Sequence, residues 1–356
     1  MHIPGTNEDI RAALEDVNLP SLLLTLATIT GSDEWLAERY QPAPIEAPAG
    51  SMFPDDTGRF APEIQDEIKM AAVRIIGDLR DGQIELSPPP DQDLLQRMLS
   101  FSIAEEVNAG YAAMLMEETL FQDRDEQWQP ALSDALADGA GNQFKVLIIG
   151  AGMSGLGIAA KLKSAGIAFS IIEKNDQVGG TWYENTYPDC GVDTPNHYYS
   201  YSFNRNPTWS GYFSKRDELF SYFDDHADQF DLREHIRFNT EVQEARFNSK
   251  TNLWDVQINS KDGASVETVN VVVSAVGQLN RPSLPDIPNL ATFTGPTFHS
   301  AEWRSDIDLA DKKVAVIGTG CSCVQLLPKT AQIAERALVF QRTPHWVSPA
   351  RDYYKA

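Results

Sequence analysis

Apolar residues recur at a helical spacing along the first part of the chain. The clearest stripe follows Pro62 and consists of Ile64, Ile68, Ala71, Ala72, Ile75 and Leu79, which share one face of a helix. Further helices are predicted at residues 7–17, 22–30, 33–39 and 91–121, with Asn7, Ser21 and Asp33 as candidate N-caps. Proline-rich stretches at 41–50 and 88–90 separate them. We therefore predict an all-helical N-terminal extension over residues 1–141, and the sequence assigns no chemistry to it.

The spacing of apolar residues changes after residue 141. There, short apolar runs typical of buried parallel strands alternate with helical segments. Residues 145–149 and 168–172 are two such runs, and a helix is predicted between them at 154–165. A later run, residues 269–273, is expected to return to the same sheet. The pattern predicts an α/β fold built on parallel strands.

The turn between the first strand and the helix reads Gly150-Ala151-Gly152-Met153-Ser154-Gly155. In the G-x-G-x-x-G pattern, Gly150 allows the tight turn, Gly152 lets a pyrophosphate approach the backbone, and Gly155 lets the helix pack closely on the strand. The phosphates would lie at the helix N-terminus. The second strand ends in Glu173, whose carboxylate can accept hydrogen bonds from both ribose hydroxyls. This context predicts a site for FAD or NAD, and the alternative is a glycine-rich turn without a ligand.

A second strand and turn begin at residues 313–317, followed by Gly318-Thr319-Gly320-Cys321-Ser322-Cys323. Because Cys323 occupies the third glycine position, the helix, predicted to continue to about residue 335, should lie farther from the strand. The strand predicted at 337–340 ends near Arg342, and an Arg there accommodates a 2′-phosphate. This second unit therefore predicts NADP, unless Arg342 is an exposed side chain without a ligand. The candidate NADPH ligands are Gly318, Gly320, Ser322, Gln325 and Arg342.

The two glycine turns thus predict two Rossmann-like dinucleotide-binding units. The residues between these units form a loop, a helix and further strands. A long loop rich in Gly, Trp, Tyr and Asn follows Glu173 and is expected to carry function. A helix at 215–226 and alternating segments at 236–238, 242–247 and 253–258 come next. We predict the N-terminal part of an FAD-binding domain over residues 142–288 and the N-terminal part of an NADPH-binding domain over residues 289–356. Because such a domain needs further strands, the chain is expected to be a fragment.

Composition narrows the range of partners. The formal net charge of -22 disfavours nucleic acid and anionic membrane surfaces, which would repel the chain. Cys190, Cys321 and Cys323 are too few for a disulfide framework, fit a reducing compartment and lack a second ligand pair for zinc, so no metal site is expected. No signal segment or membrane-spanning run is recognised, which makes the cytoplasm the expected location.

One further motif carries a family resemblance. Phe293, Gly295, His299 and Trp303 fit the pattern F-x-G-x-x-x-H-x-x-x-W, the fingerprint of type I Baeyer-Villiger monooxygenases. Many members of that family have Pro where this chain has Arg304. The loop after Glu173 adds further matches at Gly179-Gly180-Thr181-Trp182 and at Asp193. Residues 144–352 therefore resemble this family, and together with the helical extension they are most similar to the 4-hydroxyacetophenone monooxygenases within it.

The resemblance implies FAD and NADPH as cofactors, with Gly180, Thr181, Trp182 and Asp193 beside the flavin. In such enzymes NADPH reduces the flavin, the reduced flavin takes up O2, and one oxygen atom is inserted next to a ketone carbonyl to give an ester or lactone. It further implies that Asp193 orients an active-site Arg from beyond residue 356, and that His299 couples NADPH binding to domain movement. The implied substrate is an aryl ketone such as 4-hydroxyacetophenone. A homodimer through the helical extension is a further expectation.

Several alternatives stay open. The chain can be a catalytically silent fragment that binds FAD, or part of an N-hydroxylating flavin monooxygenase, although those normally carry Phe or Tyr and then Lys where this chain has Trp303-Arg304. A flavin disulfide reductase would need a cysteine pair near the flavin, and Cys190 stands alone in its loop. For the two catalytic candidates, His299 can be a hydrogen-bonded linker residue and Asp193 can simply brace its own loop.

Overall fold

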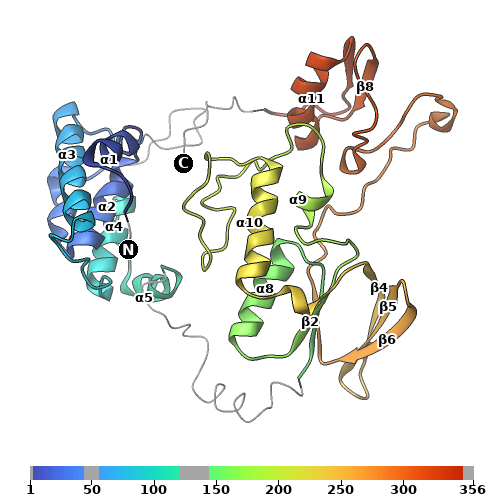
Figure 1. The fold of residues 1–356 in the computed structure, drawn as a ribbon, viewed down its shortest axis with the longest axis horizontal. Helices are drawn as coiled ribbons and strands as arrows, with labels where there is room; N and C mark the ends of the chain where they lie inside the picture. The colour runs from blue at the N-terminus through green and yellow to red at the C-terminus, as the bar shows by residue number, and fades with distance from the viewer. Residues whose placement is uncertain (1–2, 44–55, 120–143, 348–356) are drawn as a thin grey trace. The chain divides into compact units, whose positions relative to one another are not determined.

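The computed structural model describes residues 3–43, 56–119 and 144–347. The chain falls into two units, Met1–Gln127 and Trp128–Ala356 (Figure 1). The proline-rich stretch at 41–50 lies mostly outside the described residues, and the boundary predicted at residue 141 lies wholly outside them. The domain limits drawn from the sequence therefore stay predictions.

The first unit is helical, as its apolar stripe predicts. Its elements are α1 (Asn7–Ala13), α2 (Leu19–Thr30), η1 (Asp33–Leu36), η2 (Glu38–Tyr40), α3 (Pro62–Arg80), α4 (Gln92–Ile103) and α5 (Ala109–Glu118). The centre of its core lies between α2 and α3, where Leu23, Leu26, Ile68 and Ala72 are fully buried. Burial of these apolar side chains is the main source of the unit's stability.

The caps of the first two helices differ from those predicted. Thr6, rather than Asn7, caps α1, because its Oγ1 accepts from the Asp9 amide at 3.3 Å while the Asp9 carboxylate accepts from the Thr6 amide at 2.6 Å. This is a reciprocal capping box. Asn18, rather than Ser21, caps α2, because its Oδ1 accepts from the Ser21 amide at 2.9 Å.

Two predicted segments are also divided. Residues 33–39 form the short 3-10 turns η1 and η2, and Ser32 caps the first of them in place of Asp33. The single helix expected at 91–121 is two helices, since Ala104 adopts a left-handed conformation with a φ of 55° after α4. One left-handed residue ends a helix without changing the apolar pattern around it, which is why the sequence did not reveal the break.

A four-stranded parallel sheet organises the second unit, with the strand order β3-β2-β1-β7. Its strands are β1 (Val146–Ile149), β2 (Phe169–Ile172), β3 (Ile236–Arg237) and β7 (Val271–Ser274). Val146 of the central strand lies opposite Phe169 on one side and Val271 on the other. The two strands predicted around the first glycine turn and the predicted return of the chain to the sheet are therefore confirmed.

The two faces of this sheet pack against different layers, because side chains alternate along each strand. The packing elements are α8 (Met153–Ser164), α10 (Arg216–Gln229), β4 (Thr240–Asn248), β5 (Leu253–Ser260) and β6 (Gly263–Val269). Val146, Ile148 and Ile171 share a core with α8 and α10. Leu147 and Ile172 share another with the antiparallel sheet β4-β5-β6. Strand β6 was not predicted, since most of its residues are exposed and it carries no apolar run.

The last part of the unit is a second strand-helix-strand segment. Strands β8 (Lys313–Ile317) and β9 (Arg336–Phe340) pair in parallel and are joined by α11 (Cys321–Ile333). These bounds agree closely with the strands predicted at 313–317 and 337–340. Short turns lie in the connections: α9 (Thr181–Glu184), η3 (Arg233–His235), η4 (Leu290–Thr292) and η5 (Ser300–Glu302).

Neither a membrane-spanning helix nor a metal-binding cluster is found among the described residues. None of the helices in residues 3–43, 56–119 and 144–347 has the length and apolar character needed to cross a bilayer. The same residues contain no group of three or more His, Cys, Asp or Glu side chains arranged to hold a metal ion.

An aromatic cluster joins α8 to α10 and encloses a histidine. The Tyr201 hydroxyl donates to the Met153 carbonyl, and its ring lies where a Cβ on Gly157 would be only 2.8 Å from Cε1. His226 is fully buried, with its ring centroid 4.4 Å from that of Tyr201. Its Nδ1 lies 2.8 Å from Asn204 Nδ2 and accepts from it, so Nε2 carries the proton and has no partner among the described residues. Burial lowers the pKa of His226 to about 4.

The buried histidine predicts a loss of stability in acid. Because the folded pKa, about 4, lies below the ordinary 6.5, the contribution of the neutral ring is complete above pH 6.5 and is lost as the pH falls toward 4. Between pH 7 and pH 4 we expect the free energy of unfolding of the native chain to fall by up to about 3 kcal/mol more than that of His226→Phe. Urea titrations followed by tryptophan fluorescence measure this difference. A His197→Phe control, at an exposed position, should keep the native pH dependence, and an equal slope in His226→Phe would contradict the assignment.

Candidate functional site

The first glycine turn is closed to side chains at two of its three glycines. Gly150 has a φ of 102°, and a Cβ there would lie 2.7 Å from the Ala275 carbonyl oxygen at the end of β7. At Gly155 a Cβ would lie 1.9 Å from the Gly150 carbonyl oxygen, far inside van der Waals contact. Helix α8 therefore begins directly against the turn, as the sequence pattern predicts.

A second pair of glycines lies on this turn. The Gly179 amide donates to the Ala151 carbonyl at 3.0 Å. Gly180 has a φ of 52°, and a Cβ there would lie 2.9 Å from the Gly152 Cα. Two backbone segments from separate parts of the chain thus meet with no side chain between them. Backbone N–H groups brought together in this way, at the start of a helix, suit the phosphates of a dinucleotide.

Glu173 holds the turn to the end of β2. The residue is 4% exposed; its Oε2 accepts from the Ala151 amide at 2.7 Å and its Oε1 accepts from the Asn175 amide at 2.9 Å. Each carboxylate oxygen has further acceptor capacity, so these bonds do not exclude ribose hydroxyls. The structure adds a role that the sequence did not predict, which is to fix the position of the turn. The role of Glu173 as a ribose ligand stays a prediction.

The flavin candidates after Gly180 occupy the short helix α9. Trp182 is buried and its Nε1 donates to the Tyr199 hydroxyl at 3.2 Å, whereas Thr181 is exposed. Burial raises the pKa of the Tyr199 phenol, and the negative charge of Asp193 raises it further. Trp182 therefore packs within the loop that carries Asp193.

The two catalytic candidates lie in different surroundings. Asp193 has an exposed side chain, and no hydrogen bond or ion pair joins it to His299 among the described residues. His299 is half-buried, and its Nδ1 accepts from the Ala301 amide at 3.0 Å, which caps η5. The ring then carries its proton on Nε2 when neutral. The structure does not bring the two residues together, and both roles stay predictions.

The C-terminal end of the fingerprint segment packs against the rest of the second unit, whereas Phe293 at its start is exposed. Trp303 packs on the same core as α8 and α10. Its ring meets that of Phe298 edge-on, with a centroid distance of 5.3 Å. His299 is thus held between two packed aromatic residues in the connection that leads to β8.

The second glycine turn is more open than the first. Gly318 has a φ of 107°, yet a Cβ at Gly318 or at Gly320 would meet no atom within 4 Å. Cys323, at the third glycine position, is buried in α11, and Arg342 is exposed just after β9. No ion pair joins Arg342 to another described residue, and its role toward a 2′-phosphate stays a prediction.

The side-chain amide of Gln325, predicted as an NADPH ligand, makes contacts within the chain. Its Oε1 accepts from the Tyr187 hydroxyl at 2.9 Å and from the Gly191 amide at 3.3 Å, while its Nε2 donates to the Gly191 carbonyl at 2.9 Å. The amide thereby fastens α11 to the loop that leads to Asp193. Burial raises the pKa of the Tyr187 phenol, which stays a hydrogen-bond donor. A role for Gln325 or the neighbouring Ser322 toward NADPH stays a prediction.

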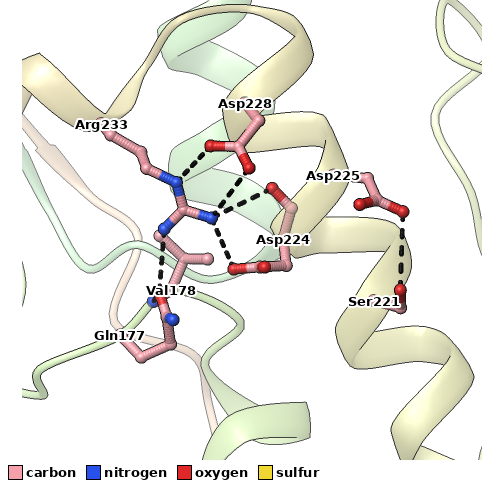
Figure 2. A network of polar contacts seen from close by, with 7 residues as sticks. All are labelled: Gln177, Val178, Ser221, Asp224, Asp225, Asp228 and Arg233. Carbon is pink, nitrogen blue, oxygen red and sulfur yellow. Dashed lines mark hydrogen bonds and ion pairs between the residues drawn. The ribbon is translucent and has the colours of Figure 1, made fainter.

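Sequence reasoning missed two polar networks around the flavin candidates. Glu184 binds Lys174 Nζ at 2.9 Å and accepts from Asn175 Nδ2 and Asn280 Nδ2 at 2.9 and 2.6 Å, which links α9 to the segments that follow β2 and β7. Figure 2 shows the other network, in which Arg233 contacts Asp224, Asp228 and Gln177. The spacing of Asp224 and Asp228, one helical turn apart, was the available signal, but nothing in the sequence identified Arg233 as their partner.

Comparisons with known proteins agree with this geometry. The family model described as "FMO-like: Flavin-binding monooxygenase-like" matches residues 143–352. An uncharacterized monooxygenase of Sinorhizobium fredii, y4iD, is 37% identical over 351 residues, which cover 97% of this chain and 50% of the relative. A Baeyer-Villiger monooxygenase of Streptomyces coelicolor is 44% identical over 209 residues, covering 58% of this chain and 40% of the relative.

Solved structures give the same result for the second unit. The crystal structure of OTEMO in complex with FAD and NADP aligns with a TM-score of 0.54 at 37% identity, covering 58% of this chain and 40% of that one. Cyclohexanone monooxygenase from Rhodococcus sp. Phi1 bound to NADP+ aligns with a TM-score of 0.53 at 39% identity, covering 57% and 38%. The chain spans half or less of the length of these relatives. Because the family model covers more than half of the chain, and the matched residues include both glycine turns and the closed cradle at Gly150 and Gly155, the chain belongs to the flavin-binding monooxygenase-like family.

Proposed function

We propose that this chain supplies the FAD site and part of the NADPH site of a Baeyer-Villiger monooxygenase. The observation that carries the proposal is the cradle in which Gly150 and Gly155 leave no room for a side chain and Gly180 lies against Gly152. Such a cradle fits a pyrophosphate, which needs close access to backbone N–H groups. Glu173 would hold the adenosine ribose, and Thr181 and Trp182 would border the flavin.

The cofactors would supply the redox chemistry, and the residues of the chain would bind and orient them. Bound FAD supplies the oxygenation chemistry, taking a hydride from NADPH and using O2 to convert a ketone into an ester or lactone. Gly318, Gly320 and Arg342 would hold NADPH, and the exposed guanidinium of Arg342 would bind its 2′-phosphate. Asp193 would orient an arginine, and His299, whose Nδ1 is already used by Ala301, would act through Nε2. An aryl ketone such as 4-hydroxyacetophenone is the substrate we propose.

The proposal also covers the cellular location and the oligomeric state of the enzyme. We place the enzyme in the cytoplasm, and we assign dimerisation to the helical extension. Large apolar side chains exposed on that extension support the second assignment; they are Met70, Ile103, Tyr111 and Met114. Each of these side chains, on α3, α4 or α5, exposes apolar area that a second copy would cover.

The proposal is tested by product analysis on the full-length protein. With NADPH, ¹⁸O2 and 4-hydroxyacetophenone, we expect one labelled oxygen in an ester product and one equivalent of NADPH consumed per ester. A bound flavin with no turnover of any ketone would favour the silent FAD-binding alternative. Formation of a hydroxylamine from an amine substrate would favour an N-hydroxylating monooxygenase.

In the same assay, Asp193→Ala separates flavin binding from oxygenation. We expect FAD occupancy close to native, flavin reduction by NADPH slower by on the order of tenfold, and more hydrogen peroxide released per NADPH, because misaligned charges cost most in the transition state. Flavin fluorescence, stopped-flow absorbance and peroxide assays measure the three quantities. Loss of flavin with unchanged coupling in the remaining holoenzyme would show that Asp193 only braces its loop.

Gly155→Leu tests the cradle. The side chain would be forced against the Gly150 carbonyl, so α8 would have to move away from the turn, and we expect the flavin absorbance of the purified protein to be lost. Gly320→Ala is the matched control, because a Cβ there meets nothing within 4 Å and the flavin should be retained. Full flavin occupancy in Gly155→Leu would remove this turn from the site.

Arg342→Ala tests the choice of nicotinamide cofactor. A charged contact made in both the ground state and the transition state would be removed, so the KM for NADPH should rise by roughly tenfold or more while the KM for NADH changes little. Steady-state kinetics with both cofactors measure this ratio. An equal loss with NADPH and NADH would assign Arg342 to something other than the 2′-phosphate.

A further inference from the structure

Arg233 uses each side of its guanidinium for a different partner. In Figure 2, Nε donates to the Asp228 carboxylate, Nη2 donates to Asp224 Oδ1 at 2.7 Å, and Nη1 donates to Gln177 Oε1 at 3.0 Å. The two carboxylates belong to the C-terminal half of α10, and Arg233 itself opens η3 just before β3. The third partner, Gln177, lies in the loop that follows β2.

This third partner stands next to the cradle. Gln177 Oε1 also accepts from the Val178 amide at 3.0 Å, so one oxygen holds both the guanidinium and the backbone of the loop. Val178 is fully buried. The next residue, Gly179, donates to the Ala151 carbonyl, and Gly180 then lies against Gly152. The segment from Gln177 to Gly180 is therefore held by Arg233 at one end and lies on the phosphate turn at the other.

The ion pairs themselves add little to global stability. The side chains of Arg233, Asp224 and Asp228 are 33%, 29% and 61% exposed, and ion pairs that water reaches contribute little to the free energy of unfolding. Their geometry, in contrast, is specific, because a planar guanidinium with two fixed carboxylates can present Nη1 in only one direction. A lysine would keep the charge but not these three directions.

We propose that Arg233 is a positioning residue for FAD, acting through Gln177 to keep Gly179 and Gly180 against the phosphate-binding turn. The inference rests on the proposed flavin function. Arg233 does not contact the turn itself. Asp224 and Asp228 fix the orientation of its guanidinium, and the bond from Nη1 to Gln177 in turn fixes the position of the Gln177 side chain. The oxygen of Gln177, rather than its size or its nitrogen, is the feature that matters.

The test compares FAD dissociation constants, measured by flavin fluorescence on the apoprotein of the full chain. Gln177→Met removes the acceptor and should raise the dissociation constant roughly tenfold, whereas Gln177→Glu keeps an acceptor and should bind FAD as the native chain does. Arg233→Lys should also weaken binding roughly tenfold, and the two weakening changes together should do little more than either alone. Asp225→Asn is the control, since Asp225 lies on the same helix and contacts only Ser221 in Figure 2.

Thermal unfolding of each apoprotein separates positioning from a loss of fold. We expect the midpoint of Gln177→Met to stay within about 2 °C of the native value, because its side chain is only half-buried. Native affinity in Gln177→Met, or equal weakening in Gln177→Glu or Asp225→Asn, would overturn the inference while leaving the proposed function intact. Failure of the unaltered chain to bind FAD would overturn the proposed function and this inference with it.

Discussion

The absence of a side chain at Gly155 is the constraint on which the second unit depends. A Cβ at this position would lie 1.9 Å from the Gly150 carbonyl oxygen, so α8 can leave the turn at this angle only with glycine. The position of α8 then sets the rest of the layer. Its buried residues Leu156, Ala159 and Ala160 share a core with the sheet, and Gly157 admits the ring of Tyr201. Through Tyr201 the same helix packs on α10, which carries the aspartates that hold Arg233.

The two glycine turns have similar sequences but different degrees of closure. Gly150 is crowded by the carbonyl of Ala275, because β7 lies beside β1 and brings its end over the turn. Gly318 and Gly320 meet no such neighbour among the described residues. A glycine pattern therefore shows where another part of the backbone can approach closely. Whether it does so depends on the strand that lies beside the turn. The third position agrees with this view, since the first turn requires glycine and the second accommodates Cys323.

The sequence predicted those parts of the molecule that local pattern determines. The strands around both turns, α8, α10 and α11 follow from short apolar runs and helical spacing, and their positions agree with the prediction to within a few residues. The caps at Thr6 and Asn18 were missed by one and three positions, because Thr, Asn and Ser next to a helix start are all good caps. Contacts between residues far apart in the sequence could not be predicted from it. Gln325 has the same sequence context whether it binds a cofactor or Gly191, and the link from Arg233 to Gln177 depends on the fold that brings them together.

The negative charge of the chain opposes the binding of an anionic cofactor. With a formal net charge of -22, the surface as a whole repels a dinucleotide, whose phosphates are anionic. Screening limits that repulsion to roughly 8 Å at physiological salt, so the immediate surroundings of the phosphates decide the outcome. Helix α10 carries Asp217 and Glu218 in its first turn, whereas α8 and α11 carry no acidic residue there. The helices that follow the glycine turns thus carry no acidic residue in their own first turns, and the Glu173 carboxylate beside the first glycine turn is already bound to the Ala151 amide. Backbone N–H groups and the helix dipole can then attract phosphate locally while the remaining surface stays anionic.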